Sequence, residues 1–109
     1  MIPLSSAELN LRSTELRAAG WVIDRDATAL LQTYKFANFP AAMAFMALVA
    51  PVAEAADHHP EWSNVYNRVE VRLTTHDAGG VTEKDIKLAQ HMESIYLTLA
   101  SRMNAQALR

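Results

Sequence analysis

The sequence predicts an α+β protein of two layers, a four-stranded antiparallel sheet with helices packed on one face. Helical and strand-like hydrophobic periods follow one another along the chain in the order α-β-β-α-β-β-α. Long runs that would suit parallel βαβ units are missing, which favours an antiparallel sheet. The 109 residues are enough for one domain, over residues 1–109, and for no more.

The first part of the chain predicts a helix followed by a β-hairpin. Ser5 and Glu8 have the spacing of a capping box, so a helix should begin near Ser5, and Gly20 should end it. A strand over residues 21–23, a turn over residues 24–26 and a second strand over residues 28–36 should follow. One face of the second strand should carry Leu30, Gln32, Tyr34 and Phe36.

A second helix should run from a cap at Asn38 to His59, because a residue before proline is pushed out of the helical region. Pro51 lies inside this helix and removes one backbone hydrogen bond, so we expect a kink there. The apolar stripe should consist of Phe39, Met43, Met46, Ala50 and Ala53, widened by Phe45, Val49 and Val52.

The second half of the chain predicts two more strands and a long helix. Residues 67–74 alternate between apolar and charged side chains, and residues 61–65 suggest a shorter strand. A break at residues 78–80 precedes a helix that should open at Thr82 and run to about Met103. Its apolar stripe should be Ile86, Ala89, Met92, Tyr96, Leu99 and Met103.

Composition disfavours several classes of function. The formal net charge is −2, and Glu70 separates the nearest approach to a basic stripe, Arg68 and Arg72, so direct nucleic-acid binding is not expected. No apolar run is long enough for a membrane span, and the first residues lack the pattern of a secretory signal. Without cysteine there is no disulfide framework. We expect a cytoplasmic protein.

His58 and His59 stand side by side before Pro60, where regular structure should end. Adjacent residues share a cavity only at such an end, since they diverge within a helix or a strand. Histidine titrates near neutral pH, so the pair can hold one charged and one neutral ring, as acid–base catalysis requires. His76 follows the strongest strand and should meet the helix end, whereas His91 should lie on the surface.

Structural explanations compete with the catalytic one. An isolated His-His-Pro is more often a structural cap or chance than a site. Three histidines with Asp57 or Glu61 suit a zinc site by residue type, but adjacent histidines lack the usual ligand spacing. Asp85 stands at a good helix-capping position after Thr82. Trp62 and Tyr66 are more often part of a core than the wall of a ligand site. Glu54 has a simple alternative too, a place on the exposed face of its helix.

Two motifs resemble the pterin-4a-carbinolamine dehydratase family. The first is His-His-Pro-x-Trp-x-Asn-Val-Tyr-Asn over residues 58–67, and the second joins Thr75, His76, Gly79, Thr82 and Asp85. They occur in order within DHHPEWSNVYNRVEVRLTTHDAGGVTEKD, residues 57–85, and apolar residues upstream of them also match. The resemblance extends from the first helix to the last. It implies the same four-stranded antiparallel sheet with helices on one side.

The resemblance implies loss of water from 4a-hydroxytetrahydropterin to give quinonoid dihydropterin, in pterin cofactor recycling, with no metal or other cofactor. It assigns catalysis to His58, His59 and His76, and assigns Asp85 as the acid that supports one of them. His58 and His76 would act as acids toward the hydroxyl, and His59 would bind substrate and act as base. Pterin binding would involve Asp57, His58, His59, Trp62, Thr74, Thr75 and His76.

The resemblance also implies a homodimer or homotetramer. An open sheet edge and a small core agree with that expectation. In animals the family also serves as a dimerisation cofactor of a homeodomain transcription factor. The alternative function is therefore a non-catalytic dimerisation or partner-binding module of the same fold.

Overall fold

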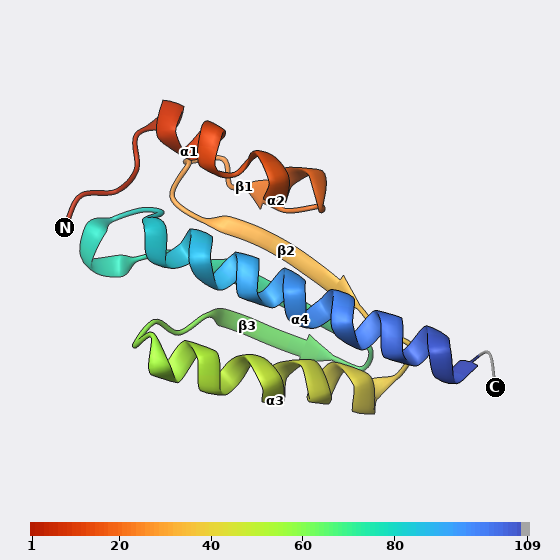
Figure 1. Ribbon diagram of the computed structural model, residues 1–109. Helices are drawn as coiled ribbons and strands as arrows, with labels where there is room; N and C mark the ends of the chain where they lie inside the picture. The colour runs from red at the N-terminus through yellow and green to blue at the C-terminus, as the bar shows by residue number, and fades with distance from the viewer. Residues whose placement is uncertain (108–109) are drawn as a thin grey trace.

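The structure is a computed structural model that describes the backbone of residues 1–107 and the side chains of residues 1–102 (Figure 1). A four-stranded sheet has the order β1-β2-β4-β3, and all neighbouring strands are antiparallel. The helices lie on one face of this sheet, which confirms the predicted α+β architecture. The strands are β1 Val22–Ile23, β2 Leu30–Lys35, β3 Glu61–Val65 and β4 Arg68–Leu73.

Strand β4 lies at the centre of the sheet between β2 and β3. The register pairs Leu30 with Leu73 on one side of β4, and Glu61 with Arg72 on the other. Alternate residues of β4 point into the core, as the sequence predicted, and these are Val69, Val71 and Leu73. Because Arg72 alternates with them, it points to the open face of the sheet together with Glu61.

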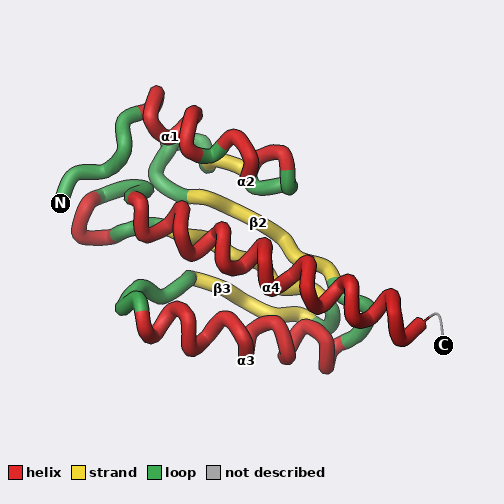
Figure 2. Tube along the Cα trace, in the orientation of Figure 1, coloured by secondary structure: helices red, strands yellow, loops and turns green. Residues whose placement is uncertain are grey.

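Four α-helices and one short 3₁₀ helix complete the described part of the chain (Figure 2). The predicted first helix is divided at Ser13, which is fully buried and whose Oγ donates a hydrogen bond back to the Asn10 carbonyl at 3.5 Å. Such local bonding of a serine side chain competes with helix continuation. The helices are α1 Ser6–Arg12, α2 Thr14–Ala18, α3 Phe39–Ala55, η1 His76–Ala78 and α4 Glu83–Ala107.

The capping box at the start of α1 is confirmed. Ser5 Oγ accepts from the Glu8 amide at 3.1 Å, and Glu8 Oε1 accepts from the Ser5 amide at 2.9 Å. Hydrogen bonds from Ser5 lower the pKa of the Glu8 carboxyl. Two orphan amides of the helix start are thereby satisfied.

Helix α3 buries only part of the predicted stripe: Phe45, Val49 and Ala53 are buried as predicted, and Ala42 is buried in addition. Phe39 and Ala50, in contrast, are exposed. Nearly every residue of α3 is apolar, so hydrophobic periodicity alone could not select the face that packs. The helix continues through Pro51, which lies on its exposed side, and Figure 1 draws it as one unbroken ribbon.

Helix α4 lies across the sheet beside α3. Of its predicted stripe, Ile86, Ala89 and Met92 are buried, and Tyr96 and Leu99 are half-buried and pack against the core. The side chain of Met103, the last predicted member, lies outside the described residues. Tyr34 of β2 and Trp21 both donate hydrogen bonds to Glu93 Oε2 of α4, the latter at 3.0 Å. Burial, followed by the bond to Glu93, raises the pKa of the Tyr34 hydroxyl. No helix in the described part of the chain is long and apolar enough to span a membrane.

Candidate active site

The C-terminus of α3 sets the position of His58. The helix ends at Ala55 rather than at His59 as predicted, because Asp57 adopts a left-handed conformation with φ of 49°. The His58 amide then donates to the Ala53 carbonyl at 3.0 Å, and the Asp57 amide donates to that of Glu54 at 3.1 Å. This pair of bonds is a Schellman motif. It ends the helix upstream of His59, the residue at which Pro60 was expected to end it. His58 consequently points inward.

A tight loop after β4 positions Thr75 and His76. The Thr75 amide donates to the Gly80 carbonyl at 3.0 Å, and the Thr75 carbonyl accepts from the amides of Ala78 and Gly79. Gly79 has φ of 72°, which a residue without a side chain adopts at no cost. The loop leaves Thr75 buried and His76 exposed at the start of η1.

Asp85 is fully buried in the first turn of α4 and joins these segments. Its Oδ2 accepts hydrogen bonds from the Thr82 amide at 2.9 Å and from Thr75 Oγ1 at 2.8 Å. Its Oδ1 lies 2.6 Å from Nε2 of His58, which is itself 8% exposed. Asp85 therefore caps the helix, as its spacing from Thr82 predicted, and also contacts a histidine.

His59 lies on the surface and pairs with Glu54. Its Nε2 is 2.8 Å from Glu54 Oε1, and both side chains are largely exposed. Glu54 comes from the last turn of α3, so the reversal at Asp57 brings it alongside His59. Its place on an exposed helix face agrees with one sequence expectation, but its contact with His59 was missed. The sequence signal for that contact is a glutamate five residues before the histidine.

His76 approaches Glu61 at the start of β3, with His76 Nε2 at 4.0 Å from Glu61 Oε2. The same Glu61 oxygen accepts a hydrogen bond from Arg72 Nη1 at 2.6 Å. Arg72 Nη2 lies 3.8 Å from Asp24 Oδ2. Burial alone would raise the pKa of Asp24, but hydrogen bonds from Thr28 and Ala29 and the charge of Arg72 outweigh it and lower the pKa.

The other predicted pterin-binding residues occupy different environments. Asp57 is exposed, and Trp62 is half-buried and packs against the core from β3. Thr74 Oγ1 donates to the Thr28 carbonyl at 2.6 Å, and the Thr75 hydroxyl is turned inward to Asp85. His91 is exposed on α4, as predicted.

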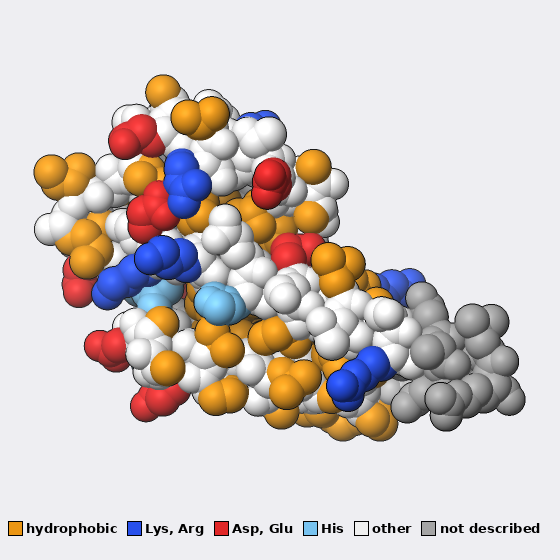
Figure 3. Space-filling model, in the orientation of Figure 1, with side chains coloured by type: hydrophobic (Ala, Val, Ile, Leu, Met, Phe, Trp, Pro, Cys, Tyr) orange, Lys and Arg blue, Asp and Glu red, His pale blue; other side chains and the backbone are white. Residues whose placement is uncertain are grey.

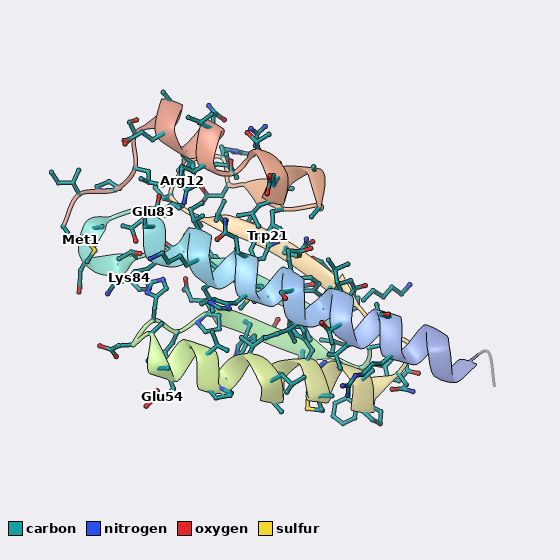
Figure 4. The ribbon with its side chains drawn as sticks, in the orientation of Figure 1. Met1, Arg12, Trp21, Glu54, Glu83 and Lys84 are labelled. Atoms are coloured by element: carbon teal, nitrogen blue, oxygen red, sulfur yellow. The ribbon has the colours of Figure 1, made fainter. Side chains whose placement is uncertain are left out.

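A hollow of about 540 Å³ lies between the end of α3 and the start of α4. Ala55 and Ala56 line it on one side and Lys84, Lys87 and His91 on the other. Figure 3 shows blue and pale blue side chains gathered over this part of the surface, and Figure 4 shows Lys84 there, with Glu54 on the far side of α3. Among the described residues, no three histidine, aspartate or glutamate side chains form a group suited to a metal ion.

Arg12 joins the first helix to the start of α4 beside this end of the molecule. Its Nε and Nη2 donate to the two carboxylate oxygens of Glu83, each at 2.7 Å, and Figure 4 shows the two side chains meeting. The bond to Arg12 lowers the pKa of Glu83. Glu83 and Lys84, the two residues before Asp85, are thus charged and exposed, while Asp85 itself is buried.

Comparisons with known proteins identify the family. The model of the family described as Pterin 4 alpha carbinolamine dehydratase matches residues 2–95. The chain belongs to this family. It is accordingly an enzyme of the dehydratase class, a carbon–oxygen lyase.

Individual relatives agree with this membership in the dehydratase family. A protein from Bordetella avium, provisionally named a pterin-4-alpha-carbinolamine dehydratase, is 59% identical over 73 residues, covering 67% of this chain and 68% of the relative. One from Rhizobium johnstonii with the same provisional name is 49% identical over 90 residues, covering 83% and 87%. A crystal structure described as a transcriptional coactivator/pterin dehydratase from Brucella melitensis has a TM-score of 0.80 and 46% identity, covering 86% of this chain and 98% of that one.

Proposed function

We propose that this dehydratase removes water from 4a-hydroxytetrahydropterin to give quinonoid dihydropterin by histidine acid–base catalysis, in pterin cofactor recycling. The observation that carries the proposal is the contact of His58 Nε2 with buried Asp85 at 2.6 Å, in a chain of this family. A carboxylate beside an imidazole orients the ring and stabilises its protonated form, as in other acid–base sites.

The reaction needs two proton transfers. One proton goes to the hydroxyl on C4a, which leaves as water, and one is removed from the neighbouring ring nitrogen, so that a carbon–nitrogen double bond forms. Each transfer by a positioned side chain contributes roughly 10²–10⁴-fold to the rate. In this proposal His58 and His76 act as acids toward the hydroxyl, and His59 binds substrate and acts as base.

The carboxylates beside the other two histidines support these roles. Glu54 Oε1 lies 2.8 Å from His59 Nε2, and Glu61 Oε2 lies 4.0 Å from His76 Nε2. Asp57, Trp62, Thr74 and Thr75 remain proposed pterin contacts, through backbone groups where their side chains are engaged elsewhere. No metal or cofactor enters the proposal, so the purified enzyme should keep its activity after treatment with a chelator.

The deciding experiment is a dehydration assay on 4a-hydroxytetrahydropterin generated by an aromatic amino acid hydroxylase. The enzyme should accelerate formation of quinonoid dihydropterin above the spontaneous rate, and a chelator should leave this acceleration unchanged. A rate equal to the spontaneous one would refute the proposed substrate. Activity that disappears with a chelator and returns with zinc would refute the metal-free mechanism.

A second candidate is a non-catalytic dimerisation or partner-binding module of the same fold. It is favoured by the description of the Brucella melitensis structure as a transcriptional coactivator as well as a dehydratase. Exposed apolar side chains on α3 and β3, Leu48 and Val65 among them, offer surface for such a partner. If wild-type enzyme and variants of all three histidines dehydrated pterin at the spontaneous rate, this module would become the better account.

We also propose that the chain is a single domain, forms a homodimer or homotetramer, and works in the cytoplasm without membrane or direct nucleic-acid partners. The uncapped edges of the sheet at β1 and β3 support self-association. Cell fractionation and sedimentation are the corresponding measurements.

A further inference from the structure

Asp85 lies at the end of a series of hydrogen bonds, and in each of them the donor and the acceptor can be assigned. The Thr75 hydroxyl has a single hydrogen, and it donates this hydrogen to Asp85 Oδ2 at 2.8 Å. Thr82 Oγ1 lies 2.8 Å from Thr75 Oγ1, so the Thr82 hydroxyl must be the donor in that contact. Thr82 Oγ1 in turn accepts from the Lys84 amide at 3.3 Å. The direction runs from the α4 backbone through two threonines to Asp85.

These donors fix the orientation of the carboxylate. Oδ2 accepts from both the Thr82 amide and the Thr75 hydroxyl, which leaves Oδ1 to face His58 Nε2 at 2.6 Å. Oδ2 is the acceptor in both of these contacts, because an amide N–H and a hydroxyl each point at it. Imidazole is a stronger base than a carboxylate, so the proton between His58 and Asp85 belongs on Nε2.

The other ring nitrogen of His58 remains available. No hydrogen bond to His58 Nδ1 occurs among the side chains of residues 1–102, and no buried side-chain nitrogen or oxygen in that range lacks a partner. Nδ1 must therefore lie in the small exposed part of His58, which is 8% of the residue. This edge is where a ligand can reach the ring.

We propose that Thr82, Thr75 and Asp85 hold His58 with its proton on Nε2, so that Nδ1 is the atom that exchanges protons with the substrate. In the protonated ring, Nδ1–H gives its proton to the C4a hydroxyl, which leaves as water. The other proton remains on Nε2, where it is hydrogen-bonded to Asp85 Oδ1. Thr75 is then a positioning residue that acts through Asp85. This role rests on the proposed function, whereas the location of the proton does not.

The first test reads the proton directly. Nitrogen-15 NMR of the imidazole rings distinguishes the two neutral tautomers in the ligand-free enzyme, and the spectrum of His58→Gln identifies the His58 signals. Wild-type His58 should show a protonated Nε2 and an unprotonated Nδ1. A neutral His58 with its proton on Nδ1 would overturn the proposal, whatever the enzyme does to pterin.

Asp85→Asn gives the sharper result. The two donors at Oδ2 should select the amide oxygen of the new side chain, so that its NH₂ group faces His58 Nε2. Nε2 must then accept, and the His58 proton should move to Nδ1, with turnover falling by about 10⁴-fold as in the corresponding change of a His–Asp pair in serine proteases. An unchanged His58 tautomer in this variant would overturn the proposed orientation.

Thr75→Val tests the positioning role at nearly constant volume. The variant should show a mixture of His58 tautomers and a kcat lower by about ten- to a hundred-fold with KM little changed. Thr75→Ser should restore both. Thr98→Val is the matched control, because the Thr98 hydroxyl bonds only to the Ser94 carbonyl further along α4. A fully folded Thr75→Val enzyme with the wild-type kcat and tautomer would refute the role of Thr75. A correct tautomer in an enzyme that does not dehydrate pterin would instead refute the proposed function.

Discussion

Each of the three histidines of the proposed site lies beside its own carboxylate, and the three pairs differ in burial. His58 and Asp85 are buried, whereas the pairs of His59 with Glu54 and of His76 with Glu61 are exposed. Solvent screens exposed pairs, so their attraction holds the partners less tightly. The geometry of His58 should therefore be the most constrained, and that of His59 and His76 should depend more on bound substrate.

Alanine substitutions should separate the roles of the histidines. His58→Ala and His76→Ala should lower kcat by roughly 10²–10⁴-fold, the range for loss of a general acid. His59→Ala should also raise KM, since His59 is assigned to hold the substrate. Steady-state assays measure both constants, with His91→Ala as the control because His91 is exposed on α4 and has no role in the proposed reaction. Wild-type kcat in either acid variant would remove that histidine from catalysis.

Stability should distinguish the buried pair from the exposed histidines. Asp85→Ala removes the cap of α4 and should lower the free energy of unfolding by about 0.5–2 kcal/mol. His58→Ala leaves Asp85 Oδ1 without its partner and should cost about 1–3 kcal/mol. His76→Ala should cost little, because His76 is exposed and its nearest carboxylate is 4.0 Å away. Urea denaturation of the three variants measures these losses. The loss in His76→Ala should be the smallest, and equal losses in all three would contradict this prediction.

At the scale of elements, Tyr34 of β2 and Trp21 are tied to α4 through Glu93. Tyr34 also contacts Phe36, Phe45 and Tyr96 in an aromatic cluster, with its ring centroid 4.8 Å from that of Phe45 and 4.7 Å from that of Tyr96. Ionising Tyr34 would put a second negative charge beside Glu93 in this partly dry site. The sheet and the helix layer are thus joined by a contact that requires a neutral tyrosine.

Alkaline pH should weaken this connection between β2 and α4. The pKa of Tyr34 is raised in the folded protein, so its contribution to stability is complete below the unfolded pKa of about 10 and declines as pH rises above that value. Tyr34→Phe should flatten the fall in unfolding free energy above that pH. In a spectrophotometric titration of the native enzyme, Tyr34→Phe should leave the tyrosinate signal unchanged. A smaller signal in the variant would show that Tyr34 ionises in the native state.

The elements differ in how far sequence could predict them. Strand β4 alternates apolar and charged residues, so its buried face followed directly from the period of two. Helix α3 is apolar on almost every side, and its buried stripe of Ala42, Phe45, Val49 and Ala53 depends on the neighbours it meets. Its end at Ala55 was missed, because aspartate adopts the left-handed conformation only occasionally and Pro60 offered a stronger local signal.

The contacts of the site also differ in how far the sequence could predict them. The position of Asp85 as a cap followed from its spacing to Thr82 along one chain segment. The contacts of Thr75 with Asp85, and of Arg72 with Glu61, join segments whose distance in space depends on the folded sheet. Spacing within the sequence carries no information on such pairs, so they could be found only from the structure.

At the scale of the whole molecule, the sheet has two strands with only one neighbour. Strand β1 has two residues, whereas β3 has five. The last residue of β3, Val65, and Tyr66 after it both have exposed side chains. A long, exposed edge of this kind pairs readily with another strand. Strand β3 is therefore the better surface for a second copy of the chain.

A charge at the end of β3 should accordingly weaken self-association. Lysine on an edge strand opposes pairing between chains, so Val65→Lys should shift the enzyme toward monomer. Leu97→Lys on α4 is the matched control, since Val65 and Leu97 are both 62% exposed and Leu97 lies away from the sheet edge. Sedimentation at micromolar concentration should find wild type and Leu97→Lys as dimers or tetramers and Val65→Lys as a smaller species. A wild-type monomer at that concentration would refute the proposed oligomer, and a Val65→Lys oligomer of unchanged size would place the interface away from β3.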